Sequence, residues 1–175
     1  MVVRLESRAF AESAVRASLA HILAETSIAS ISTVTPGHRA HINTAFVAYT
    51  PDLEFYYISD PAAAHAQNLL RNPSMALTIF RSTQRWGGDD RGAQLFGTGR
   101  RVAGAATKTA RRVYARRFPR YAQYLRGRTP QDRLLADGLR TLAFFRFTPD
   151  RVQVLDEGRF GAATFANATV RRTRR

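Results

Sequence analysis

Five polar side chains between residues 41 and 80 have the chemistry to hold a ligand. They are the amides Asn43 and Asn68, the hydroxyls Thr44 and Ser59, and the imidazole of His65. Hydroxyl, amide and imidazole groups all offer hydrogen bonds to the oxygen atoms of a bound molecule. All five fall where predicted strands meet a predicted helix, and helix N-termini favour phosphate groups. The spacing predicts a binding floor on a sheet, with a helix end beside it as a phosphate seat.

Several kinds of site are excluded by what the sequence lacks. The chain has no cysteine, which removes disulfides, thiol catalysis and thiolate metal sites. It has no phosphate-binding loop motif, and Gly97-Thr98-Gly99 is only the opening of a dinucleotide motif, inside a predicted strand. His38 and His41 form only a weak pair, so no metal site is expected. These absences favour a ready-made cofactor that brings its own reactive chemistry.

Composition places the chain among globular proteins. Its 175 residues suit one domain, and 45% of them are hydrophobic. No apolar run reaches the roughly 18 residues of a membrane span, and the first ten residues are too weakly apolar for a signal peptide. We therefore expect a soluble, cytoplasmic protein without a membrane partner.

The formal net charge of +14 comes almost entirely from arginine, since Lys108 is the only lysine. A solvated basic surface is one interpretation, and attraction to phosphate-bearing or acidic ligands is the other. Nucleic acid is not the expected partner, because the aromatic residues follow strand spacing and do not alternate with the basic clusters. The basic tail, residues 171–175, is expected to be a frayed, solvated end.

The N-terminal half predicts one helix and three strands. The helix covers residues 8–25, and the strands cover 26–34, 39–50 and 53–59. Turns at 35–38 and at Pro51-Asp52 join these strands into an antiparallel meander.

A second helix should open at Asp60-Pro61, with Asp60 as its cap and Pro61 as its first residue, and run to about Leu70. Further strands are predicted at 75–80 and 93–102, on either side of a polar loop that contains Trp86. Gly97 and Gly99 would permit a bulge or the close approach of a flat ligand.

The C-terminal half predicts basic helices and a closing hairpin. The helices cover 107–127, with a break near Pro119, and 130–139; the hairpin strands are 142–148 and 151–155, joined by Pro149-Asp150. The helices combine an apolar side with many arginines. Covering one end of a barrel is the expected role, and binding an acidic polymer or a membrane is the alternative.

Short strands with closely spaced turns predict a mainly β protein with covering helices (α+β), built on a small antiparallel barrel. We expect a single domain over 1–175. Within it, the N-terminal helix covers about 8–25, the barrel about 27–103 and 140–156, and a helical insertion about 105–138.

The order of several segments resembles the pyridoxamine 5'-phosphate oxidase-like family, the FMN-binding split barrels. The segments are Ile28–Val34, His41–Tyr49, Tyr56–Ser59, His65–Pro73 (HAQNLLRNP) and Arg91–Gly99 (RGAQLFGTG), with a weaker similarity at Phe144–Leu155. The Asn-Leu-x-x-Asn-Pro element before an apolar strand is the most specific of them, and the order of all the segments carries the resemblance.

The resemblance implies a homodimer of six-stranded split barrels, with FMN bound across both chains. The implied cofactor contacts are Asn43, Thr44 and Ala45 at the flavin or its phosphate, Ile58, Ser59 and His65 near the phosphate, Asn68 beside them, Gln94 from the fifth strand, and Trp86 from the neighbouring chain. The catalytic residues and the substrate are left open.

The implied activity is hydride transfer between flavin and a nicotinamide or another small organic substrate. True pyridoxamine 5'-phosphate oxidase activity is not expected. His65 replaces the usual lysine or arginine, Asn43 replaces a typical arginine, and the oxidase's C-terminal Arg-Leu-x-Pro is missing. A deazaflavin-dependent reductase and a haem-binding split-barrel protein are the alternatives.

Overall fold

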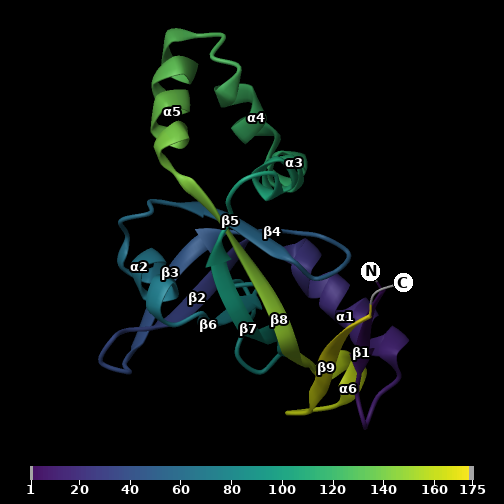
Figure 1. Cartoon of the computed structure of the whole chain (residues 1–175). Coiled ribbons are helices and arrows are strands. Elements are labelled where there is room, and N and C mark those ends of the chain that lie inside the picture. Colours follow the sequence, from purple (N-terminus) through teal and green to yellow (C-terminus); the bar gives the residue numbers. More distant parts are fainter. Residues whose placement is uncertain (1, 174–175) are drawn as a thin grey trace.

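The computed structural model describes residues 2–173, which form a large antiparallel sheet with helices around it (Figure 1). The strands are β1 (Val2–Glu6), β2 (Ile28–Val34), β3 (Ala40–Phe46), β4 (Ala48–Tyr49), β5 (Phe55–Ser59), β6 (Ser74–Phe80), β7 (Arg91–Arg101), β8 (Ala143–Asp156) and β9 (Phe165–Thr173). The helices are α1 (Glu12–Glu25), α2 (Ala64–Arg71), α3 (Ala106–Arg117), α4 (Pro119–Leu125), α5 (Pro130–Thr141) and α6 (Glu157–Phe160).

The strand pairings run in a closed circuit, as the predicted barrel requires. β2 lies between β3 and β6, β6 pairs with β7, and β7 pairs with β8. The N-terminal part of β8 pairs with β5, and β5 pairs with β4. Only Val47 separates β3 from β4, so the predicted strand 39–50 is one bent strand in two pieces that returns the circuit to β2.

The predicted closing hairpin at Pro149-Asp150 is wrong. β8 runs without a turn from Ala143 to Asp156, and β7 pairs with it along almost all of its length. The proline is accommodated by a shift in register between Phe96 and Gly97 on β7. A proline that cannot donate a ladder hydrogen bond is tolerated at such an irregularity. Phe96 and Gly97 of β7 pair with Arg151 and Pro149, so Asp150 of β8 is the extra residue of the bulge. A bulge, one of the two features that Gly97 was predicted to permit, is therefore present in this strand pair, and β8 continues through it.

Two strands at the termini were not predicted. β1 pairs with β9, and β9 pairs with the C-terminal half of β8. In β9 the inward residues are Ala166, Ala168 and Val170. Small side chains give a weak alternating signal, which is why Arg171–Thr173 was wrongly expected to be frayed. The remaining two residues of the predicted tail, 174 and 175, lie outside the described part of the chain.

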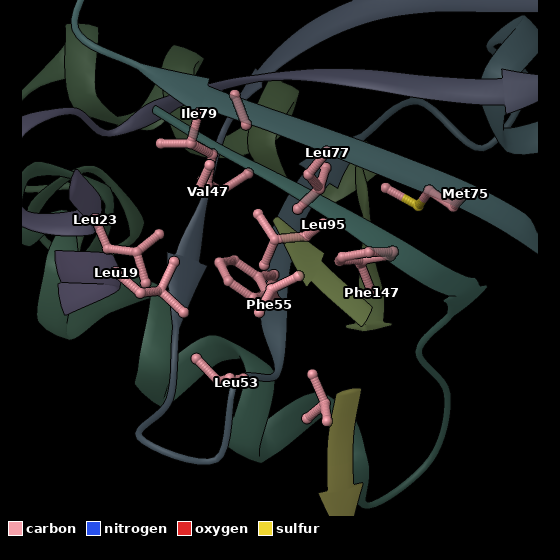
Figure 2. Packing of buried hydrophobic residues seen from close by; sticks show 14 of the residues in the cluster. Leu19, Leu23, Val47, Leu53, Phe55, Met75, Leu77, Ile79, Leu95 and Phe147 are labelled. Atoms are coloured by element: carbon pink, nitrogen blue, oxygen red, sulfur yellow. The ribbon is translucent and has the colours of Figure 1, made fainter. Parts of the chain in front are cut away.

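The barrel interior and α1 share one hydrophobic core (Figure 2). α1 contributes Leu19 and Leu23, and the strands contribute residues such as Phe55, Leu95 and Phe147. Burying a side chain of this size stabilises the fold by roughly 1.5–3 kcal/mol. The helix begins at Glu12, later than the predicted residue 8.

A second hydrophobic cluster lies between the barrel and the helices α3–α5, which project from the sheet in Figure 1. Tyr114 and Tyr121 pack edge-on against Phe144 of β8. Arg117 fastens α3 to the end of α1, since its Nη2 donates to the carbonyls of Leu23 and Thr26 at 2.8 Å. Within residues 2–173, no helix combines the length and apolarity needed to cross a membrane.

Candidate functional site

The barrel circuit opens between β3 and β5, and α2 lies beside this opening. β4 and β5 pair only at Ala48–Tyr56 and Tyr49–Phe55. Beyond these pairs, β3 is hydrogen-bonded to β2 alone, and β5 continues along β8. α2 packs against β2, β3 and β7. Side chains from β3, β5 and α2 therefore meet in one place, which we call the split.

Ser59 and His65 form the first contact in the split. Ser59 ends β5 on the same face as the buried Phe55 and Tyr57, so its hydroxyl points toward the barrel interior. The Ser59 Oγ lies 2.9 Å from Nε2 of His65, at the start of α2. His65 is 7% exposed. His65 therefore does not lie on an exposed helix surface, and its imidazole is part of a packed polar pair.

A second contact joins α2 to β2. Asn68 donates from Nδ2 to the Thr33 hydroxyl at 3.0 Å, and both residues are buried. Thr33 is the cross-strand partner of His41 on β3. The ring centroids of His41 and His65 are 6.3 Å apart. The split therefore holds two imidazoles, two hydroxyls and an amide.

Within the described residues 2–173, three polar atoms around the split are buried without a hydrogen-bond partner. They are Nδ1 of His41, Oδ1 of Asn43 and the hydroxyl of Tyr57. Buried polar groups in folded proteins are almost always paired, because an unpaired one costs about 1–3 kcal/mol. Several unpaired groups close together are what a site for a polar ligand would contain.

Burial and charge both act on His65. Burial lowers the pKa of His65 below its ordinary value of 6.5, and a smaller contribution from nearby His41 acts in the same direction. The imidazole is therefore neutral at pH 7, with one ring nitrogen that donates and one that accepts.

The helix start differs from the prediction. α2 begins at Ala64, and Asp60 accepts from the Ala62 N–H in the turn before it. Pro61 is therefore outside the helix, because the Asp60 side chain closes a local turn first. Among the residues that the structure describes, no side chain caps α2, so the N–H groups of its first turn remain available near Ser59.

The structure divides the other predicted residues between two faces. Asn43 and Ala45 face inward, since their β2 partners Ile31 and Ala29 are buried in the core. Thr44 alternates to the outer face. Ile58 packs against the second hydrophobic cluster, on the opposite side of β5 from Ser59. Asn43 and Ala45 therefore do not meet Thr44 and Ile58 at one site within a single chain.

Gln94 and Trp86 are also away from the split. Gln94 lies on the outer face of β7, in a cavity of about 270 Å³ that Thr78 and Phe80 also line. Trp86, in the loop between β6 and β7, is fully exposed. It is therefore not packed on its own chain.

The outer face of the sheet carries a row of polar residues in register across six strands. The row is Thr44, Ser30, Thr78, Gln94, Gln153 and Asn167. Exposed apolar residues of the same strands lie beside it; they are Ile28, Ile42, Phe46, Phe80 and Phe165. Such a concentration of large apolar side chains marks an interaction surface.

Three residues of the split were missed as ligand contacts. His41 shares the inward face of β3 with Asn43, and Tyr57 shares that of β5 with Ser59. Strand alternation, at spacings of two, could have identified both. Thr33 could not be found this way, because its contact with Asn68 depends on where α2 docks.

The sequence profile of a family described as "Pyridoxamine 5'-phosphate oxidase" matches residues 15–156. No curated protein sequence matches the chain. The match begins inside α1 and ends with β8, so it includes every strand of the barrel circuit.

Solved structures with the same fold have low sequence identity. A haem-binding protein from Mycobacterium smegmatis superposes with a TM-score of 0.67 at 16% identity, over 91% of this chain and 59% of that one. The present chain thus spans less than two thirds of that protein. The haem storage protein HutZ from Vibrio cholerae gives a TM-score of 0.55 at 16% identity, over 75% of this chain and 87% of HutZ.

A third similar structure is from Clostridium acetobutylicum. That protein is described as related to general stress protein 26 of B. subtilis, in the pyridoxinephosphate oxidase family. The TM-score is 0.59 at 10% identity, over 88% of this chain and 93% of that one. At these identities the three structures establish a common fold.

Proposed function

This chain belongs to the pyridoxamine 5'-phosphate oxidase-like family, and on that premise we propose that it is a homodimeric FMN-binding oxidoreductase. The observation that carries the proposal is the polar group in the split, where buried Asn43 and His41 atoms lack partners beside the Ser59–His65 pair. A phosphate there would accept one hydrogen bond from the Ser59–His65 pair, whose other hydrogen lies between the two side chains, and further hydrogen bonds from the uncapped N–H groups of α2.

The flavin would supply hydride transfer, and the chain would bind and orient it. Asn43 faces inward from β3, and its unpaired Oδ1 would accept a hydrogen bond from a polar group of the ligand. The neutral imidazole of His65 offers a directed hydrogen bond in place of a permanent positive charge. Binding would then depend on geometry and on exclusion of water more than on charge.

The proposed dimer would join two copies through the outer face of the sheet. Thr44, Gln94 and Trp86 lie outside the split of their own chain. A second copy seated on the exposed apolar residues would bury them and bring Trp86 toward its partner's cofactor. In such a dimer Thr44, Gln94 and Trp86 would contact the partner chain or its cofactor, which they cannot do in a single chain.

The test is titration of the purified protein with FMN, followed by the quenching of flavin fluorescence. We expect saturation at one FMN per chain, and weaker binding by about tenfold or more in Ser59→Ala and in His65→Ala, because charged-group hydrogen bonds are worth about 1.5–3 kcal/mol. His38→Ala is the matched control, because His38 lies in an exposed turn. Unchanged binding in both site variants would reject the assignment.

Haem is the second candidate, and one feature of the split favours it. Neutral imidazole is a common ligand of haem iron, and His41 has a free buried Nδ1 close to the neutral His65. Two structures of similar fold are described as haem-binding and haem-storage proteins. Parallel titrations with haem, FMN and a deazaflavin separate the alternatives. If haem binds tightly and gives a sharp Soret band, and neither FMN nor the deazaflavin binds, the haem-binding function is selected.

A further inference from the structure

The groove between α3 and α4 carries three cations without an acidic partner. It is an open cavity of about 400 Å³ in the helical insertion, which projects beyond the barrel in Figure 1. Lys108, Arg111 and Arg112 line it from α3. Within residues 2–173, none of the three takes part in an ion pair, and no acidic side chain lines the groove.

These cations are unfavourably placed for the helix itself. Residues three and four positions apart lie on one face of a helix, so Lys108 repels Arg111 and Arg112. Lys108 also falls in the first turn of α3, where no acidic residue is present and where the helix dipole disfavours positive charge. A bound anion would relieve both repulsions.

Apart from the hydroxyl of Thr107, the rest of the groove is mostly apolar. Its floor and far wall are formed by Ala115 of α3 and by Tyr121, Ala122 and Leu125 of α4. Tyr121 is only 8% exposed, and its ring is held edge-on to Tyr114 and Phe144. A ring held in this way cannot serve as a platform on which a nucleic-acid base stacks, which separates this groove from single-strand binding sites.

We propose that this groove binds an amphipathic carboxylate, with its head among Lys108, Arg111 and Arg112 and its apolar chain over Ala122 and Leu125. Small-molecule sites combine a mostly apolar lining with a few convergent polar groups, and this volume lies within their range. At roughly 30 Å³ for each non-hydrogen atom, the cavity suits a ligand of about a dozen such atoms. The site is distinct from the split and does not depend on the flavin proposal.

The probe is decanoate, added to the intact protein and followed by isothermal titration calorimetry. We expect one decanoate per chain. Butyrate should bind more weakly by about tenfold or more, because it lacks most of the apolar chain. Decyltrimethylammonium, which has the same chain and a cationic head, should not bind at the groove. Equal binding of the anionic and cationic probes would overturn the proposal.

The double variant Lys108→Glu/Arg112→Glu tests the head group. It should weaken decanoate binding by about tenfold or more. The double variant Arg116→Glu/Arg120→Glu is the matched control, because it changes the net charge equally at exposed positions outside the groove. Circular dichroism verifies that both variants fold. Equal losses in the two variants, or binding of a short oligonucleotide in place of decanoate, would contradict a defined carboxylate site.

Discussion

At the scale of single residues, the split depends on an imidazole that burial keeps neutral. His65 is within hydrogen-bond distance of Ser59 and close to His41, whose Nδ1 has no partner. A permanent cation in this position would attract any anion, whereas neutral donors favour a ligand whose oxygens match their positions. Recognition at this site would therefore depend on shape and hydrogen bonding.

The lowered pKa of His65 predicts a loss of stability in mild acid. The unfolded chain has an ordinary histidine pKa near 6.5 and the folded chain a lower one, so the unfolded state binds more protons between the two values. The stabilising effect of the neutral imidazole is complete above pH 6.5, and it is lost as the pH falls toward the pKa of the folded protein. Urea unfolding of the ligand-free protein from pH 7.5 to pH 5 should record this decline.

His65→Gln is the comparison, because glutamine does not titrate in this range. Its free energy of unfolding should fall less steeply between pH 6.5 and pH 5 than that of the wild-type chain. If the free energy of unfolding of the two proteins depends on pH in the same way, His65 is not the group whose titration lowers the stability.

Single residues also explain which part of the candidate site could be predicted. Ser59 ends a strand and His65 lies at the start of the next helix, so the predicted positions of these two elements were enough to place the two side chains near each other. The two imidazoles meet only because β3 bends at Val47 and α2 docks beside the opening. Strand alternation could have placed His41 on the inward face with Asn43, but its closeness to His65 leaves no local signal.

At the scale of elements, the bulge between β7 and β8 lets one long strand serve two parts of the sheet. The N-terminal half of β8 pairs with β5 and its C-terminal half with β9. Turn-forming residues at Pro149-Asp150 suggested a hairpin, but they form a bulge in β8, in which Asp150 is the extra residue without a partner on β7. Pro and Asp are compatible with a turn and with a bulge alike, so the local sequence of β8 could not distinguish the two.

Gly97→Ala should destabilise the protein by about 3 kcal/mol or more, because overpacking at a close backbone contact forces the strands apart. An added Cβ would lie 2.2 Å from the Thr148 carbonyl oxygen and 2.6 Å from Cα of Pro149. The measurement is the free energy of unfolding in urea.

Gly138→Ala is the control for this prediction. Gly138 lies in α5 with no atom near the position of an added Cβ. Alanine there should stabilise the protein by up to about 1 kcal/mol, because alanine is the better helix former. A Gly97→Ala protein as stable as the wild type would mean that the two strands are not in close contact.

At the scale of the whole molecule, the outer sheet face separates the predicted site residues into two groups. Ser59, His65 and Asn68 contact one another or their neighbours around the split. Gln94 and Trp86 face outward with exposed apolar residues near Gln94. The barrel could be predicted from strand spacing and from the order of the segments. The separation of the site residues into two groups could not, because a single chain does not bring the two groups together.

Phe80→Glu should therefore convert a dimer to a monomer. Phe80 is 46% exposed and lines the cavity that contains Gln94, and a carboxylate buried in an apolar interface without a partner is strongly unfavourable. Leu134→Glu is the control, since Leu134 is 75% exposed on α5, in the helical insertion. Sedimentation velocity should give a dimer for the wild type and Leu134→Glu. A wild-type monomer, or a dimer that persists in Phe80→Glu, would contradict this interface.

The central claim is that the split receives the phosphate of a flavin, and comparison of FMN with riboflavin by fluorescence titration tests it most directly. The two ligands share the ring system and differ in the phosphate. We predict that FMN binds at least about tenfold more tightly than riboflavin, and that Ser59→Ala/His65→Ala abolishes this preference while His38→Ala retains it. Equal affinity of the wild-type protein for the two ligands would contradict the account.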